Sequence, residues 1–171
     1  MELKEVVKAR YSCRSYIDRQ LSEEALKAIL EAGRLAPTAK NLQEHHVYVL
    51  QSEEALAKVD AWTRCRFGAP TVLVVTYDKG NVYTYPGSSR QSGIEDAAIV
   101  ATHMMLAAKN EGVDSCWLNA VHMDELHEAL GLPENEDIVM LLDLGYASLE
   151  GLTPAPRHFE RKPLSETVTF M

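Results

Sequence analysis

The chain has 171 residues, a formal net charge of −8, 46% hydrophobic residues and 25% charged residues, which fits one globular domain with its own core. The negative charge argues against nucleic-acid binding, because proteins that bind nucleic acid carry a basic stripe. Neither a signal peptide nor an apolar run of the roughly 18–20 residues that a membrane span needs is present, so we expect a cytoplasmic protein without a membrane partner.

Hydrophobic periodicity divides the chain into intermingled helices and strands, without internal repeats or linkers. The helix at 21–37 is the clearest, because Ser22 can cap its start and Pro37 can end it. In chain order, the sequence predicts a helix at 2–11, a helix at 21–37, a strand at 46–50, a helix at 52–60, a strand at 70–77, a helix at 94–112, a strand at 115–121, a helix at 124–132 and a strand at 137–147.

Three segments indicate how these elements pack. The run "PTVLVVTY" (70–77) is continuously apolar, which is typical of a central strand covered on both faces. The helix at 94–112 is apolar almost all round, so it must be buried in the fold or in a subunit interface. The tail from 151 ends in the strand-like "TVTF". Because the elements follow no strict βαβ order, we predict an α+β domain with a mixed, mainly antiparallel sheet flanked by helices.

Positive side chains gather near both ends of this acidic chain. A guanidinium group can grip a phosphate through two hydrogen bonds, and a serine hydroxyl can add a third. Arginine and lysine are also common as ordinary surface charges, and the sequence around these residues does not distinguish a phosphate site from a solvated surface. The residues concerned are Arg10, Ser12, Arg14, Arg157, Arg161 and Lys162.

Two further stretches combine polar groups with apolar neighbours. In "LAPTAKNLQEHH" (35–46), Asn41 and Gln43 offer donors and acceptors that suit an amide-rich ring, although the stretch can equally be a turn that caps itself. In "GVDSCWLNAV" (112–121), the strand end could present backbone N–H groups to a flat ligand, or could be an ordinary buried strand.

Cysteine and histidine spacing indicates no metal site. Cys13, Cys65 and Cys116 form no CxxC pair, which argues against a disulfide framework and a cysteine-rich zinc site. His122 and His127 are five residues apart, which fits metal ligation on a helix poorly. Cys13 lies between two arginines that could lower its pKa, but an inert buried thiol is the better interpretation.

Taken together and in this order, the motifs resemble those of the FMN-dependent nitroreductase family. The resemblance covers the whole chain as one domain over 1–171. The segment "RYSCRSY" (10–16) is similar to the family's "RRSxRxF/Y", and "LAPTAKNLQEHHVYVL" (35–50) is similar to "APSxxNxQPWxFxVV". The strand "GAPTVLVV" (68–75), the alanine-rich helix at 94–112, "GVDSCWLNAV" (112–121) and the ending "RHFERKPLSETV" (157–168) also fit the family.

The resemblance implies the nitroreductase-like fold and an intertwined homodimer with two FMN sites at its interface. The helix at 94–112 would be the main dimer helix, and the tail from about 151 to 171 would extend onto the partner subunit. Arg14 would be catalytic through its charge, because the flavin does the chemistry. The residues that this implies for cofactor binding are Arg10, Tyr11, Ser12 and Arg14 at the phosphate and ribityl chain, Pro37, Thr38, Ala39, Asn41 and Gln43 from the partner subunit, Trp117, Leu118 and Asn119 along one flavin face, and Arg161 and Lys162 in the tail.

The same resemblance implies an oxidoreductase that passes hydride from NADH or NADPH through flavin N5 to a nitroaromatic, a quinone or a related small acceptor. Relatives use the cofactor for dehalogenation, enone reduction or flavin fragmentation. The chain departs from the family at Glu44-His45, where Pro-Trp is usual, at Lys40, where a small residue is common, and at Phe159, where many members have a basic residue. The altered entrance keeps open a second function, a flavin-binding storage or sensor protein without turnover.

Overall fold

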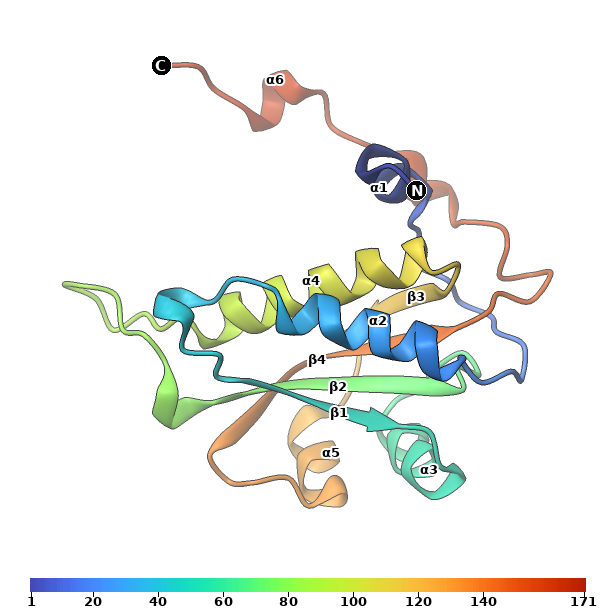
Figure 1. Ribbon diagram of the computed structural model, residues 1–171, viewed down its shortest axis with the longest axis horizontal. Helices are drawn as coiled ribbons and strands as arrows, with labels where there is room; N and C mark the ends of the chain where they lie inside the picture. Colours follow the sequence, from blue (N-terminus) through green and yellow to red (C-terminus); the bar gives the residue numbers. More distant parts are fainter.

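The computed structural model describes residues 1–171 and builds a four-stranded sheet between helices (Figure 1). The order of the strands is β1-β2-β4-β3, and every neighbouring pair is antiparallel. The predicted α+β fold with a mainly antiparallel sheet is confirmed, and the parallel contact is an isolated bridge between Ser12 and Ser115. The strands are β1 (His45–Leu50), β2 (Thr71–Asp78), β3 (Asp114–Leu118) and β4 (Glu136–Gly145).

Helices cover both faces of the sheet, so the domain has three layers (Figure 1). The second and fourth helices pack on one face, and the third and fifth pack on the other. None of the helices is both long and apolar enough to cross a membrane. They are α1 (Leu3–Ala9), α2 (Glu23–Arg34), α3 (Glu53–Trp62), α4 (Gly93–Asn110), α5 (Met123–Leu130) and α6 (Leu164–Thr167), with the short turns η1 (Ala39–Asn41), η2 (Lys79–Asn81) and η3 (Pro156–Phe159).

The central strand β2 explains the apolar run that predicted it. Leu73 and Val75 pack against the layer of α2 and α4, whereas Val72 and Val74 pack against the layer of α3 and α5. All four side chains are fully buried. Because side chains alternate along a strand, burial on both faces removes the usual apolar–polar alternation.

Local signals at the helix ends act as the sequence indicated. The Ser22 hydroxyl accepts from the backbone N–H of Ala25 at 3.1 Å, which caps α2. Gly112 follows the end of α4 with a φ of 73°, a left-handed conformation that glycine adopts without strain. At Gly33 a Cβ atom would lie 2.8 Å from the side chain of Met104, so this glycine lets α2 approach α4 closely.

Two features of the fold bear on subunit contacts. Residues 164–167 form α6, the residues after it join no strand of this chain, and Phe170 is 94% exposed, so pairing of the tail with a partner's sheet stays a prediction. No strand of the same chain lies beside this tail to pair with it. The fold alone does not bury the helix at 94–112 completely, because Ile94 is 62% and Ile99 37% exposed on α4, so burial of the rest in a subunit interface stays a prediction.

Candidate functional site

The basic residues of the N-terminal segment lie beside the start of β3. The backbone N–H of Cys13 donates to the carbonyl of Ser115 at 2.9 Å, and Ser12 forms a bridge with the same residue. The Cys13 side chain is fully buried, as expected, and burial raises the pKa of its thiol. The buried cysteine thus holds the segment in place, while Arg10 and Arg14 border a cavity.

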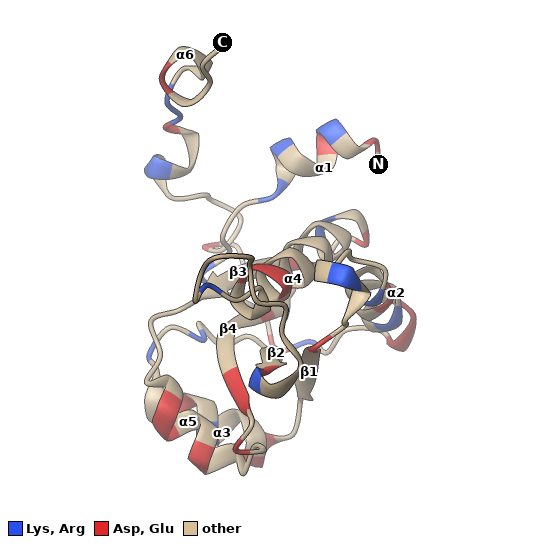
Figure 2. Ribbon diagram, turned by 90° about the vertical axis from the view of Figure 1, so that its left-hand side faces the viewer, with Lys and Arg blue, Asp and Glu red and all other residues tan.

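The C-terminal tail brings a second set of cations to the same cavity, whose volume is about 270 Å³. Figure 2 shows the tail and α1 side by side at one end of the molecule, with Lys and Arg on both. The structure therefore joins two segments that lie at opposite ends of the sequence. The lining residues are Arg10, Ser12, Arg14, Ala155, Arg157, His158 and Arg161, which we call the basic cradle.

The charges of the basic cradle repel one another. Burial and the charge of Arg161 lower the pKa of Arg10, and burial, Arg10 and Arg161 together lower the pKa of His158. The guanidinium of Arg161 is oriented by a hydrogen bond that its Nη1 donates to the Glu160 carbonyl at 2.7 Å. A multiply charged anion would relieve this repulsion, so the cavity suits a phosphate group.

Two residues expected at the cofactor do not line the basic cradle. Lys162 is exposed, with its Nζ 3.8 Å from the Glu166 carboxylate. The ring of Tyr11 is buried, and the Nζ of Lys109 lies 5.1 Å from its centroid. Of the two basic residues that could assist Arg161, the structure places Arg157 in the cavity and Lys162 outside it.

The loop after α2 is strained and exposes its amide side chains. Lys40, Asn41 and Gln43 have φ values of 52°, 56° and 53°, a left-handed conformation that costs energy for residues other than glycine. The hydroxyl of Thr38 accepts from the backbone N–H of Gln43 at 3.0 Å and closes the loop. The backbone N–H of Ala39 donates to Asp96 of α4 at 3.0 Å. Strain that the surroundings maintain is typical of functional loops.

The residues expected along the flavin lie on β3, an edge strand of the sheet. The side chain of Leu118 is buried in the core between the sheet and α5, so it can offer a ligand only its backbone. Trp117 is half-buried and Asn119 is exposed. The indole N–H of Trp117 donates to Asn119, whose amide donates to the Val139 carbonyl at 3.2 Å. Together these bonds hold an apolar ring and an amide at the strand end.

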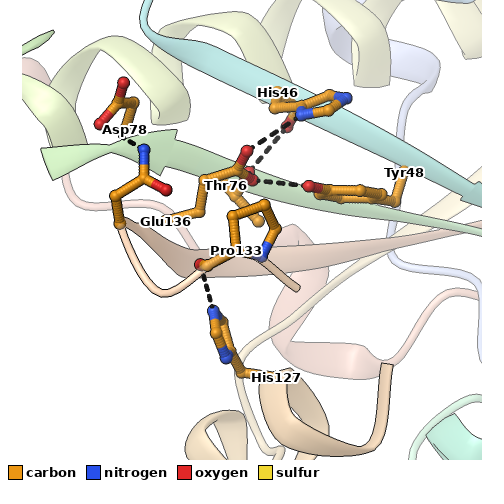
Figure 3. Close-up of polar contacts among 8 residues, drawn as sticks. His46, Tyr48, Thr76, Asp78, His127, Pro133 and Glu136 are labelled. Carbon is orange, nitrogen blue, oxygen red and sulfur yellow. Dashed lines mark hydrogen bonds and ion pairs between the residues drawn. The ribbon is translucent and has the colours of Figure 1, made fainter. Parts of the chain in front are cut away.

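A larger cavity of about 560 Å³ lies beyond Asn119, and sequence reasoning missed it. At its wall, Glu136 accepts hydrogen bonds from Thr76 at 2.6 Å and Tyr48 at 2.9 Å and contacts His46 at 3.1 Å (Figure 3). Burial alone would raise the pKa of Glu136, but these bonds lower it below its usual value. We call this cavity the acidic pocket; its lining residues include Asp124, Glu128, Glu134, Glu136, Asp137 and a single lysine, Lys79.

Comparison with known proteins agrees with this geometry. The model of the nitroreductase family matches residues 7–68 and 64–146. A protein of Archaeoglobus fulgidus with the provisional name NADH dehydrogenase/NAD(P)H nitroreductase is 35% identical over 85% of both chains. A nitroreductase family protein of Clostridium difficile 630 superposes with a TM-score of 0.93 at 35% identity, over 99% of this chain and 98% of that one. A nitroreductase of Bacteroides fragilis with bound FMN gives 0.79 at 26% identity, over 100% and 99%. The chain belongs to the nitroreductase family.

Proposed function

We propose that the protein is an FMN-dependent NAD(P)H oxidoreductase that reduces a small acceptor such as a nitroaromatic or a quinone. The observation that carries this proposal is the basic cradle, where four arginines from two distant segments of an acidic chain meet His158 and Ser12. Family membership and the FMN bound to the relative from Bacteroides fragilis identify the anion that fits it.

The donor set of the basic cradle fits the phosphate of FMN. Arg10, Arg157 and Arg161 would bind its oxygens, and the Ser12 hydroxyl would bind the phosphate or the ribityl chain. The half-buried Trp117 and the backbone of β3 would support the flat ring. Bound FMN supplies hydride transfer through N5 from a reduced nicotinamide to a second substrate, so the chain needs no nucleophile or base of its own.

In this proposal the chain positions both substrates and provides fixed charge. Arg14 would stabilise negative charge where hydride transfer places it, because a cation fixed in advance at such a position lowers the barrier. The acidic pocket beyond Asn119 would admit the second substrate. The chain would act in the cytoplasm, because its three free cysteines are typical of a reducing compartment.

We further propose a site shared by two subunits of a homodimer. Ala39 is bound to Asp96 near one end of α4, whereas Tyr11 and the basic cradle lie near Lys109 at the other end, about 20 Å along the helix (Figure 1). The exposed Ile94 and Ile99 of α4 and the exposed tail would be covered by the partner. Deletion of residues 151–171 should then convert a dimer to a monomer in light scattering; a full-length monomer would contradict this arrangement.

The proposed activity is tested with purified protein reconstituted with FMN. We expect a flavin visible spectrum that bleaches promptly on anaerobic mixing with NADH or NADPH and recovers when a nitroaromatic or a quinone is added. A protein that binds FMN but is bleached by neither donor would be a storage or sensor protein, the function that the unusual Glu44-His45 keeps open. A protein that binds no FMN would contradict both functions.

A further inference from the structure

Glu44 and its surroundings distinguish this chain from the family pattern, in which proline is usual at this position. Glu44 directly follows the strained loop of residues 38–43 and is only 4% exposed. Its backbone carbonyl accepts from the N–H of Asp78 at 2.9 Å, which ties it to the end of β2. Its Oε1 accepts from the hydroxyl of Ser92, the residue before α4, at 3.1 Å. Burial of this carboxyl group therefore follows from the fold.

A second buried carboxyl group belongs to the same cluster. Asp96 is 4% exposed in the first turn of α4, and its Oδ1 accepts from the backbone N–H of Ala39 at 3.0 Å. One oxygen of each carboxyl group is bonded, and the other is buried without a partner: Oε2 of Glu44 and Oδ2 of Asp96. Two buried carboxylates without a cation would repel each other strongly. One proton between the two free oxygens would remove one negative charge and give both oxygens a hydrogen-bond partner.

We propose that Glu44 and Asp96 share one proton, and that this carboxyl pair is the positioning element that holds the loop of residues 38–43 in its flavin-binding conformation. The inference rests on the proposed function for the identity of the ligand. The pair connects the two ends of the loop, because Asp96 holds Ala39 at its start and Glu44 follows its last residue. Loss of the proton would drive the two carboxylates apart and release the strained backbone between them.

The neighbouring groups supply no substitute for the proton. The imidazole of His45 is half-buried, its Nδ1 has no partner, and burial lowers its pKa, so it stays neutral at neutral pH. Glu95, next to Asp96, is engaged by Tyr85 and Arg90 on the outer side of α4. Burial and then the hydrogen bond to Asp96 raise the pKa of Glu44 to about 7. The shared proton is therefore held at pH 6 and lost as the pH rises through about 7.

The test compares FMN affinity of the full-length wild type, Glu44→Gln and Asp96→Asn at pH values from about 6 to 8.5. In either variant an amide N–H replaces the shared proton and does not titrate. We expect the wild-type dissociation constant to rise at least about fivefold over this range, because deprotonation costs up to tenfold per pH unit above the pKa. In the variants, the dissociation constant should change only as much as the ionisation of the FMN phosphate itself requires. The exposed Glu24→Gln is the matched control and should follow the wild type.

A second measurement needs no flavin. Hydrogen exchange of the Ala39 amide, corrected for the intrinsic pH dependence, should lose protection above about pH 7 in the wild type and keep it in Glu44→Gln. Parallel pH profiles of FMN affinity and of Ala39 protection in wild type and both variants would overturn the proposal. If no form binds FMN at any pH, the proposed function fails, while the exchange profile still decides whether the carboxyl pair holds the loop.

Discussion

Replacing Arg161 by alanine tests the basic cradle most directly, because Arg161 is one of its two tail arginines. The guanidinium is exposed to solvent and borders the cavity that we assign to the FMN phosphate. Its removal should leave the core untouched, since Arg161 is exposed and belongs to no hydrophobic cluster of the fold. We therefore expect a loss of phosphate binding in a protein that folds normally.

The size of the loss follows from charge-assisted hydrogen bonding. One such bond contributes about 1.5–3 kcal/mol, which corresponds to roughly 10- to 150-fold in affinity. Part of this loss is offset, because the substitution also removes the repulsion that helps to lower the pKa of Arg10. We expect FMN to bind about 10- to 50-fold more weakly, and Arg161→Lys, which keeps the charge but loses the planar fork, to lie in between.

The assay is fluorescence titration of the apoprotein with FMN and, in parallel, with riboflavin, which lacks the phosphate. Riboflavin affinity should change less than about twofold in Arg161→Ala, since the remaining contacts to the ring are intact. The exposed Arg64→Ala, which removes a positive charge away from the cavity, is the matched control and should leave both ligands unaffected. Unchanged FMN affinity, or an equal loss for FMN and riboflavin, would refute the assignment of the cavity to the phosphate.

Three further predictions follow from buried and clustered charges. Burial raises the pKa of Asp143 to about 8, so the free energy of unfolding should fall by up to about 5 kcal/mol as the pH rises from about 4 to 8. Urea titrations of Asp143→Asn should lack this pH dependence, and those of the control Asp18→Asn should keep it. Native protein should react rapidly with Ellman's reagent at Cys65 alone, because Cys13 and Cys116 are buried; three fast thiols would contradict the fold. The five carboxylates and one lysine of the acidic pocket give it a formal charge of −4. We therefore expect 4-nitrobenzoate to have a kcat/KM about fourfold below that of neutral 4-nitrobenzyl alcohol, and salt should close this gap; equal values would place the acceptor elsewhere.

Local sequence predicted the fold well where one physical signal dominated. The apolar β2, the serine caps and the glycine after α4 each follow from burial or backbone geometry within a few residues. The tail marks a limit of local sequence, because "TVTF" has strand propensity but no neighbouring strand in its own chain. Strand propensity shows that a segment fits a pleated sheet, but it does not show which strand would pair with it.

The basic cradle shows the opposite limit of sequence reasoning. The sequence grouped Arg10, Ser12 and Arg14 with the tail cations as a possible phosphate grip, but it did not separate such a grip from ordinary surface charges. The choice between Arg157 and Lys162 depends on the turn η3, which directs the first into the cavity and leaves the second beside Glu166. The acidic pocket was missed because its residues come from five elements, β2, η2, α4, α5 and β4, and from the segments between them. Each of its acids alone is typical of an ordinary solvated surface.

The arrangement along α4 connects these observations. One end of the helix carries the loop that Asp96 holds through Ala39, and the other end carries the basic cradle near Lys109. A protein that needs both elements around one ligand must either fold back on itself or use a second copy. The exposed Ile94 and Ile99 of α4 favour the second copy, because apolar side chains that the chain leaves uncovered gain most from burial in an interface. Flavin binding and subunit association would then stabilise each other, since a ligand that contacts both subunits favours the associated state.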